Sequence, residues 1–117
     1  MKIALLTESS SEYGRRLVDG VAAYAQKAHD WRLVWTSPDA KPIRGAFDGC
    51  SGVIARVAND ALARRLARTG LPVVDVFCQK EYPGFFGVNS NHEKIGQLAA
   101  DPFITKRHAS VAFVGHR

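Results

Sequence analysis

The feature that most constrains the fold of this chain is the alternation of short apolar runs with longer segments of helical periodicity. Four runs read as strands: Ile3–Leu6, Trp31–Trp35, Gly52–Ala55 and Leu71–Phe77. They lack strict polar and apolar alternation, which indicates a sheet covered by helices on both faces. Strands separated by helices pair in parallel through right-handed crossovers. We predict an α/β fold with an open, doubly wound parallel sheet of about five strands in the order 2-1-3-4-5.

Three segments between or after these runs carry helical signals. Each combines a capping residue with apolar side chains at helical spacing. The expected helices are Glu12 to His29 after the capping box Ser9-x-x-Glu12, a second from Asn59 or Asp60 to a closing Gly70, and a third with Ile95 and Leu98 after the capping box Ser90-x-x-Glu93.

The remaining segments give weaker signals. Ser37–Ser51 is interrupted by prolines and glycines and has room for a short helix around Ile43–Phe47. Phe85–Val88 fits either a short strand or an extended segment, and Ser110–Val114 is expected to be the final strand. We expect residues 1–117 to form a single domain.

Composition excludes several classes of protein. Hydrophobic residues make up 46% and charged residues 23% of 117 residues, which fits a globular domain and not a disordered chain. Cys50 and Cys78 lack the C-x-x-C spacing of redox and zinc sites and are expected to be buried free thiols in a reducing compartment. The net charge is +5, but the basic residues are scattered, which disfavours direct DNA binding by this segment.

The first residues also bear on the compartment. The apolar run at the start is short and ends in Glu8, which fits a buried strand and not a signal peptide. No stretch approaches the roughly 18 apolar residues of a membrane span. The sequence therefore predicts a cytoplasmic protein that does not interact with a membrane.

Ligands of open α/β sheets bind beyond the carboxyl ends of the strands. Four loops are expected there: Thr7–Tyr13, the loop that begins at Arg56, Phe77–Pro83 and Asn89–Asn91. Their hydroxyls, amides, guanidinium and aromatic rings suit a polyhydroxylated ligand, since polar groups bind its hydroxyls and rings stack on its C–H faces. The candidate ligand-binding residues are Ser9, Ser10, Tyr13, Arg56, Phe77, Asn89 and Asn91.

Most candidates also have a structural explanation, which the sequence leaves open. The structural roles are capping by Ser9 and Ser90, an ion pair of Arg56, core or interface positions of Tyr13 and Phe77, and turn formation by Asn89 and Asn91.

Catalytic patterns are missing from the sequence. The four histidines are far apart and fit no zinc pattern, and neither a G-x-S-x-G elbow nor a phosphate-binding G-x-x-x-x-G-K-[ST] loop occurs. Arg56 stands where a receiver domain would need its phosphoacceptor aspartate. A flavodoxin-like domain would cradle phosphate in the Thr7–Tyr13 loop, where Glu8 and Glu12 repel it. We therefore expect no enzyme activity, no metal and no cofactor.

A series of segments in this order resembles a known family. The segments are Gly52–Arg56, Gly70–Val74, Gly87–Asn91, Ile95–Ala100 and Ser110–Gly115. Together they look like the sensor domain of the lac-repressor/galactose-repressor family, whose fold is shared with type I periplasmic sugar-binding proteins. The resemblance covers nearly the whole chain. Tyr13–Val21 is similar to the first helix of the xylose-operon regulator branch.

This resemblance implies a function and partners. It implies a bacterial transcription regulator whose sensor binds a small sugar, a pentose such as xylose, between two lobes and so controls DNA binding allosterically. It also implies a homodimer, and a DNA-binding module outside this chain. The chain would be the N-terminal lobe, with at most half of the ligand site. A periplasmic-type sugar-binding protein and a small flavodoxin-like domain are the alternatives.

The chain departs from the family pattern at three positions. Ser90 replaces a usual aspartate, which weakens a ligand or hinge role there. Pro102 lies within the expected last helix and should kink or end it. Arg107 stands where a glycine usually closes that helix.

Overall fold

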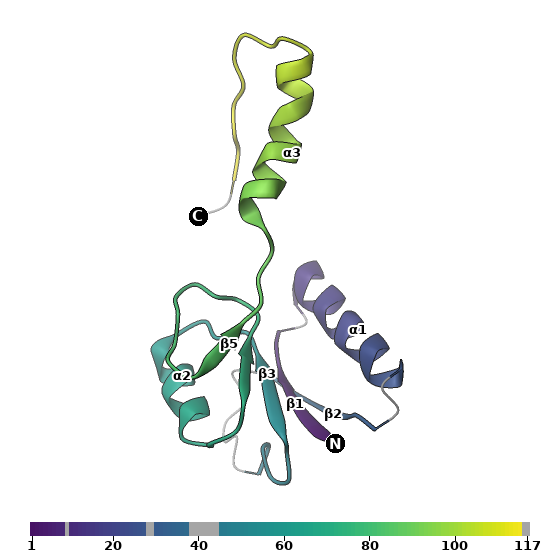
Figure 1. Cartoon of the computed structure of the whole chain (residues 1–117), viewed down its shortest axis with the longest axis vertical. Coiled ribbons are helices and arrows are strands. Elements are labelled where there is room, and N and C mark those ends of the chain that lie inside the picture. Colours follow the sequence, from purple (N-terminus) through teal and green to yellow (C-terminus); the bar gives the residue numbers. More distant parts are fainter. Residues whose placement is uncertain (9, 28–29, 38–44, 116–117) are drawn as a thin grey trace.

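The computed structural model describes residues 1–8, 10–27, 30–37 and 45–115 of the chain (Figure 1). The described residues form both strands and helices. The elements in chain order are β1 (Lys2–Leu6), α1 (Glu12–Lys27), β2 (Arg32–Thr36), β3 (Gly52–Ala55), α2 (Asp60–Ala67), β4 (Val73–Asp75), β5 (Phe85–Gly87) and α3 (His92–Thr105).

The described strands form one parallel sheet in the order β2-β1-β3-β4-β5 (Figure 1). The predicted fold class and strand order are therefore confirmed. Phe85–Gly87 is the fifth strand, so the first of the two sequence interpretations of this segment is correct.

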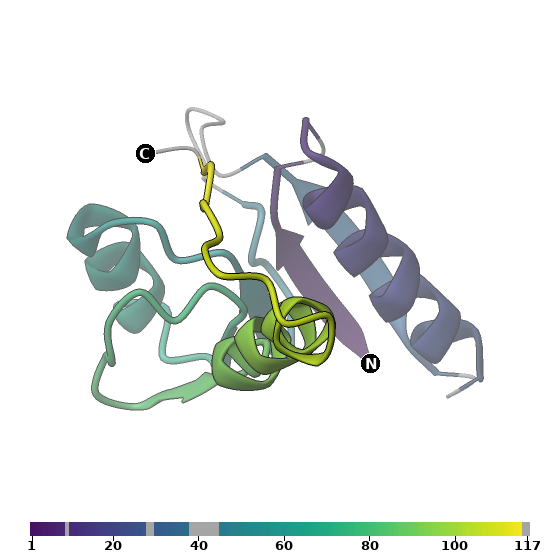
Figure 2. The ribbon, with the colours of Figure 1, turned by 90° about the horizontal axis from the view of Figure 1, so that it is seen from above.

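Helices α1 and α2 lie on opposite faces of the sheet. The crossover from β1 to β2 steps in one direction and that from β3 to β4 in the other, so right-handed connections place their helices on opposite faces. Ala4 and Leu6 pack in one core with Leu66 of α2. Ile3 and Leu5 alternate with them, are also buried and face the other side. Figure 2 shows α1 and α2 on either side of the molecule.

The helix caps lie near the expected positions, with shifts of one or two residues. The Asn59 side chain accepts a hydrogen bond from Leu62 N at 2.9 Å, which confirms this cap of α2. In α1 the capping side chain is Ser11, whose Oγ accepts from Gly14 N at 3.1 Å. The capping box predicted at Ser9 involves a residue outside the described part of the chain.

The cap predicted for the third helix is wrong. Helix α3 begins one residue later than expected, and the Asn91 side chain accepts from Lys94 N at 2.8 Å. Ser90 instead donates its backbone N–H to Asn89 Oδ1 at 2.8 Å. Asparagine caps a helix as well as serine does, so neighbouring cap candidates are hard to separate by sequence.

The final strand predicted at Ser110–Val114 is also wrong. These residues have no strand structure and are exposed. Helix α3 rises away from the sheet, and the chain after it runs back beside the helix (Figure 1). A strand needs a neighbour for its backbone hydrogen bonds, and the sheet edge lies out of reach there. Helix α3 buries no residue and covers neither face of the sheet.

Some predictions fall on residues that the structure does not describe. The end of the first helix at His29 and the start of the short helix around Ile43–Phe47 are among them, while residues 45–49 form turns. Both cysteines are free thiols: Cys50 is buried, as expected, and Cys78 is only half-buried.

Candidate ligand-binding site

The candidate site lies at the carboxyl edge of the sheet, where β1 and β3 are neighbours. The chain leaves β1 toward β2 and leaves β3 toward β4, in opposite directions, so the strand order reverses between them. Such a switch point opens a crevice between the two outgoing loops, which is where open α/β sheets bind ligands. Helix α3 stands on this side of the sheet (Figures 1 and 2).

Arg56 is the centre of this edge. Its guanidinium carbon lies 3.6 Å from the centroid of the Phe77 ring, a stacked cation–π contact. Its NH1 lies 3.7 Å from Glu8 Oε1. The Arg56 and Glu8 side chains keep 27% and 44% of their surface exposed, so both retain free hydrogen-bonding capacity toward solvent. Three loops, those after β1, β3 and β4, thus contribute one side chain each.

The loop after β1 is held firmly at its start. Thr7 is fully buried, and Trp35 of β2 donates its Nε1–H to Thr7 O at 3.0 Å. Gly14 of α1 lies directly against the next residue, because a Cβ there would be 2.0 Å from Glu8 O. On the other side, Arg56 N donates to Leu6 O at 2.9 Å and continues the sheet ladder. Glu8 is thereby fixed opposite Arg56.

Asp75, the last residue of β4, is a buried carboxylate with 3% exposure. Its Oδ1 accepts hydrogen bonds from Val57 N at 3.1 Å and Phe77 N at 2.9 Å, and its Oδ2 accepts from Cys78 N at 3.2 Å. Asp75 is not among the predicted site residues. The signal was available, since an acidic residue at the end of an apolar strand needs partners.

A cavity of about 430 Å³ adjoins the site, between the loop after β4 and strand β5. Cys78 lies on its wall with φ +49°, and its thiol donates to Asp75 O at 3.3 Å. Gly87 leaves room for this thiol, since a Cβ at that position would lie 3.0 Å from Sγ. Asn89 also lines the cavity.

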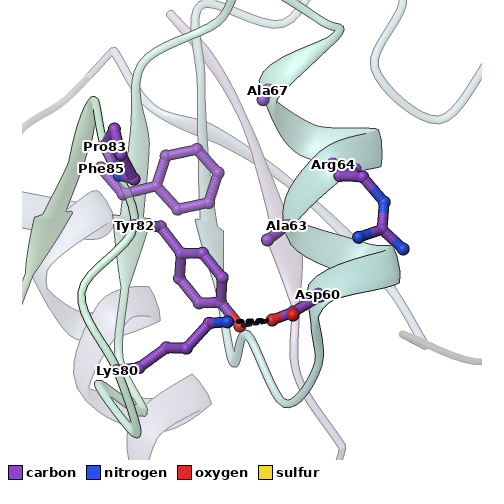
Figure 3. Close-up of a pocket in the computed structure, with 8 residues that line it drawn as sticks. All are labelled: Asp60, Ala63, Arg64, Ala67, Lys80, Tyr82, Pro83 and Phe85. Atoms are coloured by element: carbon purple, nitrogen blue, oxygen red, sulfur yellow. Dashed lines mark hydrogen bonds and ion pairs between the residues drawn. The ribbon is translucent and has the colours of Figure 1, made fainter.

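The loop after β4 is tied to the start of α2 by three residues, the exposed Asp60 and Lys80 and the half-buried Tyr82, called here the Asp60 clamp (Figure 3). Asp60 Oδ1 accepts from Lys80 Nζ at 2.6 Å and from Tyr82 OH at 3.0 Å. The hydrogen bonds from Lys80 and then Tyr82 lower the pKa of Asp60. The bond to Asp60 raises the pKa of Lys80, while desolvation and then the same carboxylate raise the pKa of Tyr82.

The predicted site residues do not all lie together. Arg56 and Phe77 are in contact, and Asn89 lies nearby on the cavity wall. Ser10 and Tyr13 are exposed at the start of α1. The two remaining candidates are Asn91, whose side chain caps α3, and Ser9, which lies outside the described residues.

Comparison of the chain with protein-family models, curated proteins and solved structures gives no match. Among the described residues, no helix is long and apolar enough to cross a membrane. No group of three or more histidine, cysteine, aspartate or glutamate side chains in the described part is arranged to hold a metal ion.

Proposed function

We propose that this chain is the ligand-sensing lobe of a cytoplasmic bacterial transcription regulator, and that it binds a small sugar at the carboxyl edge of its sheet. In this proposal the sugar is a pentose such as xylose, held between this lobe and a second one. DNA binding belongs to a module outside this chain, and the regulator is a homodimer. The observation that carries the sugar-binding part is the stacked Arg56–Phe77 pair with Glu8 beside it.

The chemistry of these three side chains favours a polyhydroxylated ligand. The guanidinium offers several N–H donors in a fixed plane to hydroxyl and ring oxygens. The carboxylate of Glu8 accepts hydrogen bonds from hydroxyl groups. The Phe77 ring provides an apolar wall, and it holds the guanidinium plane in one orientation. A sugar needs all three kinds of contact.

The charge balance favours a neutral ligand. Glu8 compensates the charge of Arg56 at 3.7 Å, so an anion would meet the carboxylate as well as the guanidinium. This disfavours the flavodoxin-like alternative, in which phosphate would lie in the loop after β1. A colourless purified protein that releases no flavin on denaturation is the result expected from the proposal.

Sugar binding is tested by NMR titration of the ¹⁵N-labelled protein with D-xylose, L-arabinose and D-ribose. Because one lobe supplies only half of the contacts, we expect a dissociation constant on the order of millimolar. The Arg56 Nε–Hε signal and the Phe77 and Asn89 amides should shift with at least one pentose. No shift with any of the three up to about 100 mM would contradict the proposal.

Arg56→Ala should abolish these shifts, because the variant loses both the donors and the stacked contact. Arg68→Ala is the matched control. Arg68 is an exposed residue at the far end of α2, so its removal changes the net charge equally without touching the site. A pentose response that survives in Arg56→Ala would remove Arg56 from the site.

A further inference from the structure

The loops after β3 and β4 meet at one buried carboxylate. Asp75 Oδ1 accepts from Val57 N, next to Arg56, and from the backbone N–H of Phe77. A single oxygen atom therefore fixes the backbone on both sides of the Arg56–Phe77 stack. Oδ2 holds Cys78 N, where the chain turns away with φ +49°.

No ion pair among the described residues involves this buried carboxyl group. The ion pairs among the described residues join Arg16 to Glu12, Arg56 to Glu8, and Lys80 to Asp60, and none includes Asp75. Its partners are three backbone N–H groups, all from site loops. A buried carboxylate is costly unless hydrogen bonds compensate it, and an apolar residue at this position would leave the three donors without a partner.

The backbone hydrogen bonds at the end of β4 show why the regular pattern of the sheet cannot satisfy the N–H groups that Asp75 binds. Val76 N donates to Ala55 O at 3.0 Å and Val88 N donates to Asp75 O at 2.9 Å, which are the last regular bonds at this end of β4. Beyond them the loops after β3 and β4 diverge, so Val57 N and Phe77 N need an acceptor that is not part of a strand. Asp75 supplies it from its side chain.

We infer that Asp75 is the positioning residue of the proposed sugar site: it sets the backbone at Arg56 and Phe77 so that the guanidinium stacks on the ring. It acts through the two loops and does not itself contact the ligand. This inference deepens the proposed function and rests on it for the effect on sugar binding. The effect on the Arg56–Phe77 stack can be tested without any sugar.

The test compares Asp75→Ala with Asp101→Ala, the same change at an exposed aspartate of α3. Stacking on Phe77 moves the side-chain proton signals of Arg56 upfield through the ring current. We expect Asp75→Ala to weaken this shift, because it removes the oxygen that accepts from Val57 N and Phe77 N. The amides of β2, on the far edge, should keep their positions. A folded Asp75→Ala protein with the full Arg56 shift would overturn the inference.

A second measurement uses the unchanged protein, in case the variant does not fold. The amides of Val57, Phe77 and Cys78 should exchange slowly with solvent, as those in the sheet do, because their acceptor is buried. Fast exchange of all three would also overturn the inference.

Pentose titration then separates the inference from the function on which it rests. We expect Asp75→Ala to weaken the pentose response by about tenfold or more. If the chain binds no pentose but Asp75→Ala still releases the stack, the positioning role stands and the proposed function fails. If the chain binds pentose equally well with Asp75→Ala, the positioning role fails and the proposed function stands.

Discussion

At the scale of single residues, the site depends on a close approach that only glycine permits. Gly14 lies in the first turn of α1, and a Cβ at this position would be 2.0 Å from Glu8 O. This atom belongs to the backbone, so it cannot move away as a flexible side chain would. Glu8, the partner of Arg56, therefore holds its place because position 14 has no side chain.

We expect Gly14→Ala to destabilise the protein by on the order of 2 kcal/mol, because the added methyl group displaces the loop after β1. Gly20→Ala on the same helix is the control. Nothing lies within 4 Å of its Cβ position, and alanine favours a helix over glycine by up to about 1 kcal/mol. Urea denaturation measures both values. Equal or greater stability of Gly14→Ala would show that the loop is free to move.

Sequence reasoning found Arg56 and Phe77 but not their support at the residue scale. Both follow a recognisable apolar strand, so their place at the carboxyl edge could be predicted. The Asp75 network involves backbone donors up to 18 positions away in the chain. No local pattern encodes where the backbone of another loop will lie, and Asp75 was therefore missed.

At the scale of elements, the Asp60 clamp joins α2 to the loop after β4. This contact makes the stability of the fold depend on pH. The pKa of Asp60 is lowered by the hydrogen bonds from Lys80 and then Tyr82, so the clamp stabilises the fold above the pKa of the unfolded chain, about 4. This contribution is lost as the pH falls through the lower, folded value. The pKa of Lys80 is raised instead of lowered. The lysine therefore stays charged, and the clamp stays intact, until alkaline pH.

Carboxyl ¹³C NMR titration tests this directly. The midpoint of Asp60 should lie below the ordinary aspartate value and move up toward it in Lys80→Gln. The control is Lys94→Gln, which removes an exposed lysine from α3 and should leave the Asp60 midpoint in place. An Asp60 midpoint that is the same with and without Lys80 would disprove the clamp.

Two residues shape the end of α3, Pro102 and Arg107. Pro102 lies inside the helix and lacks a backbone N–H, so the helix loses one bond in its last turns. Arg107 has φ +54°, the left-handed conformation that glycine usually supplies at a helix end. His108 N donates to Phe103 O at 3.1 Å and closes this end. The helix thus ends in the usual left-handed conformation, but with an arginine where glycine would be favoured.

At the scale of the whole molecule, the chain has a packed body and a projecting part. The buried residues lie in the sheet, in α1 and α2 and in the loops that join them, whereas no described residue of α3 or of the segment after it is buried. A single helix of this length is marginal in water without tertiary packing. The stability of the molecule is therefore expected to be very uneven along the chain.

We expect the amides of α3 to exchange with solvent at rates within about tenfold of an unstructured chain. Those of α2, which buries Leu62, Ala63 and Leu66, should be protected far more strongly. Hydrogen exchange followed by NMR measures both helices in one experiment, with α2 as the internal control. Similar protection of α2 and α3 would mean that α3 is packed against a partner in solution.

One face of the sheet shows the same difference between a packed and an exposed part of the molecule. Leu5, Ile54, Val74 and Phe86 are neighbours across the strands on the face that α1 covers. Leu5 is buried beneath α1's side of the sheet, while Phe86 at the other end is 66% exposed. The sequence predicted helices on both faces, and this is correct for α1 and α2. It did not predict that the third helix would leave the sheet.

The sequence alone determined strands β1 to β4, the parallel strand order and the edge at which a ligand can bind, because these follow from apolar periodicity and the handedness of crossovers. Only the tertiary structure decided which side chains meet there. Arg56, Phe77 and Glu8 come from three loops, and Asp75 holds two of those loops by backbone contacts. The course of the last quarter of the chain was also decided by tertiary structure. The sequence pattern of a helix or of an apolar segment does not show whether a sheet edge lies within its reach. Here no sheet edge lies within reach of the segment after α3.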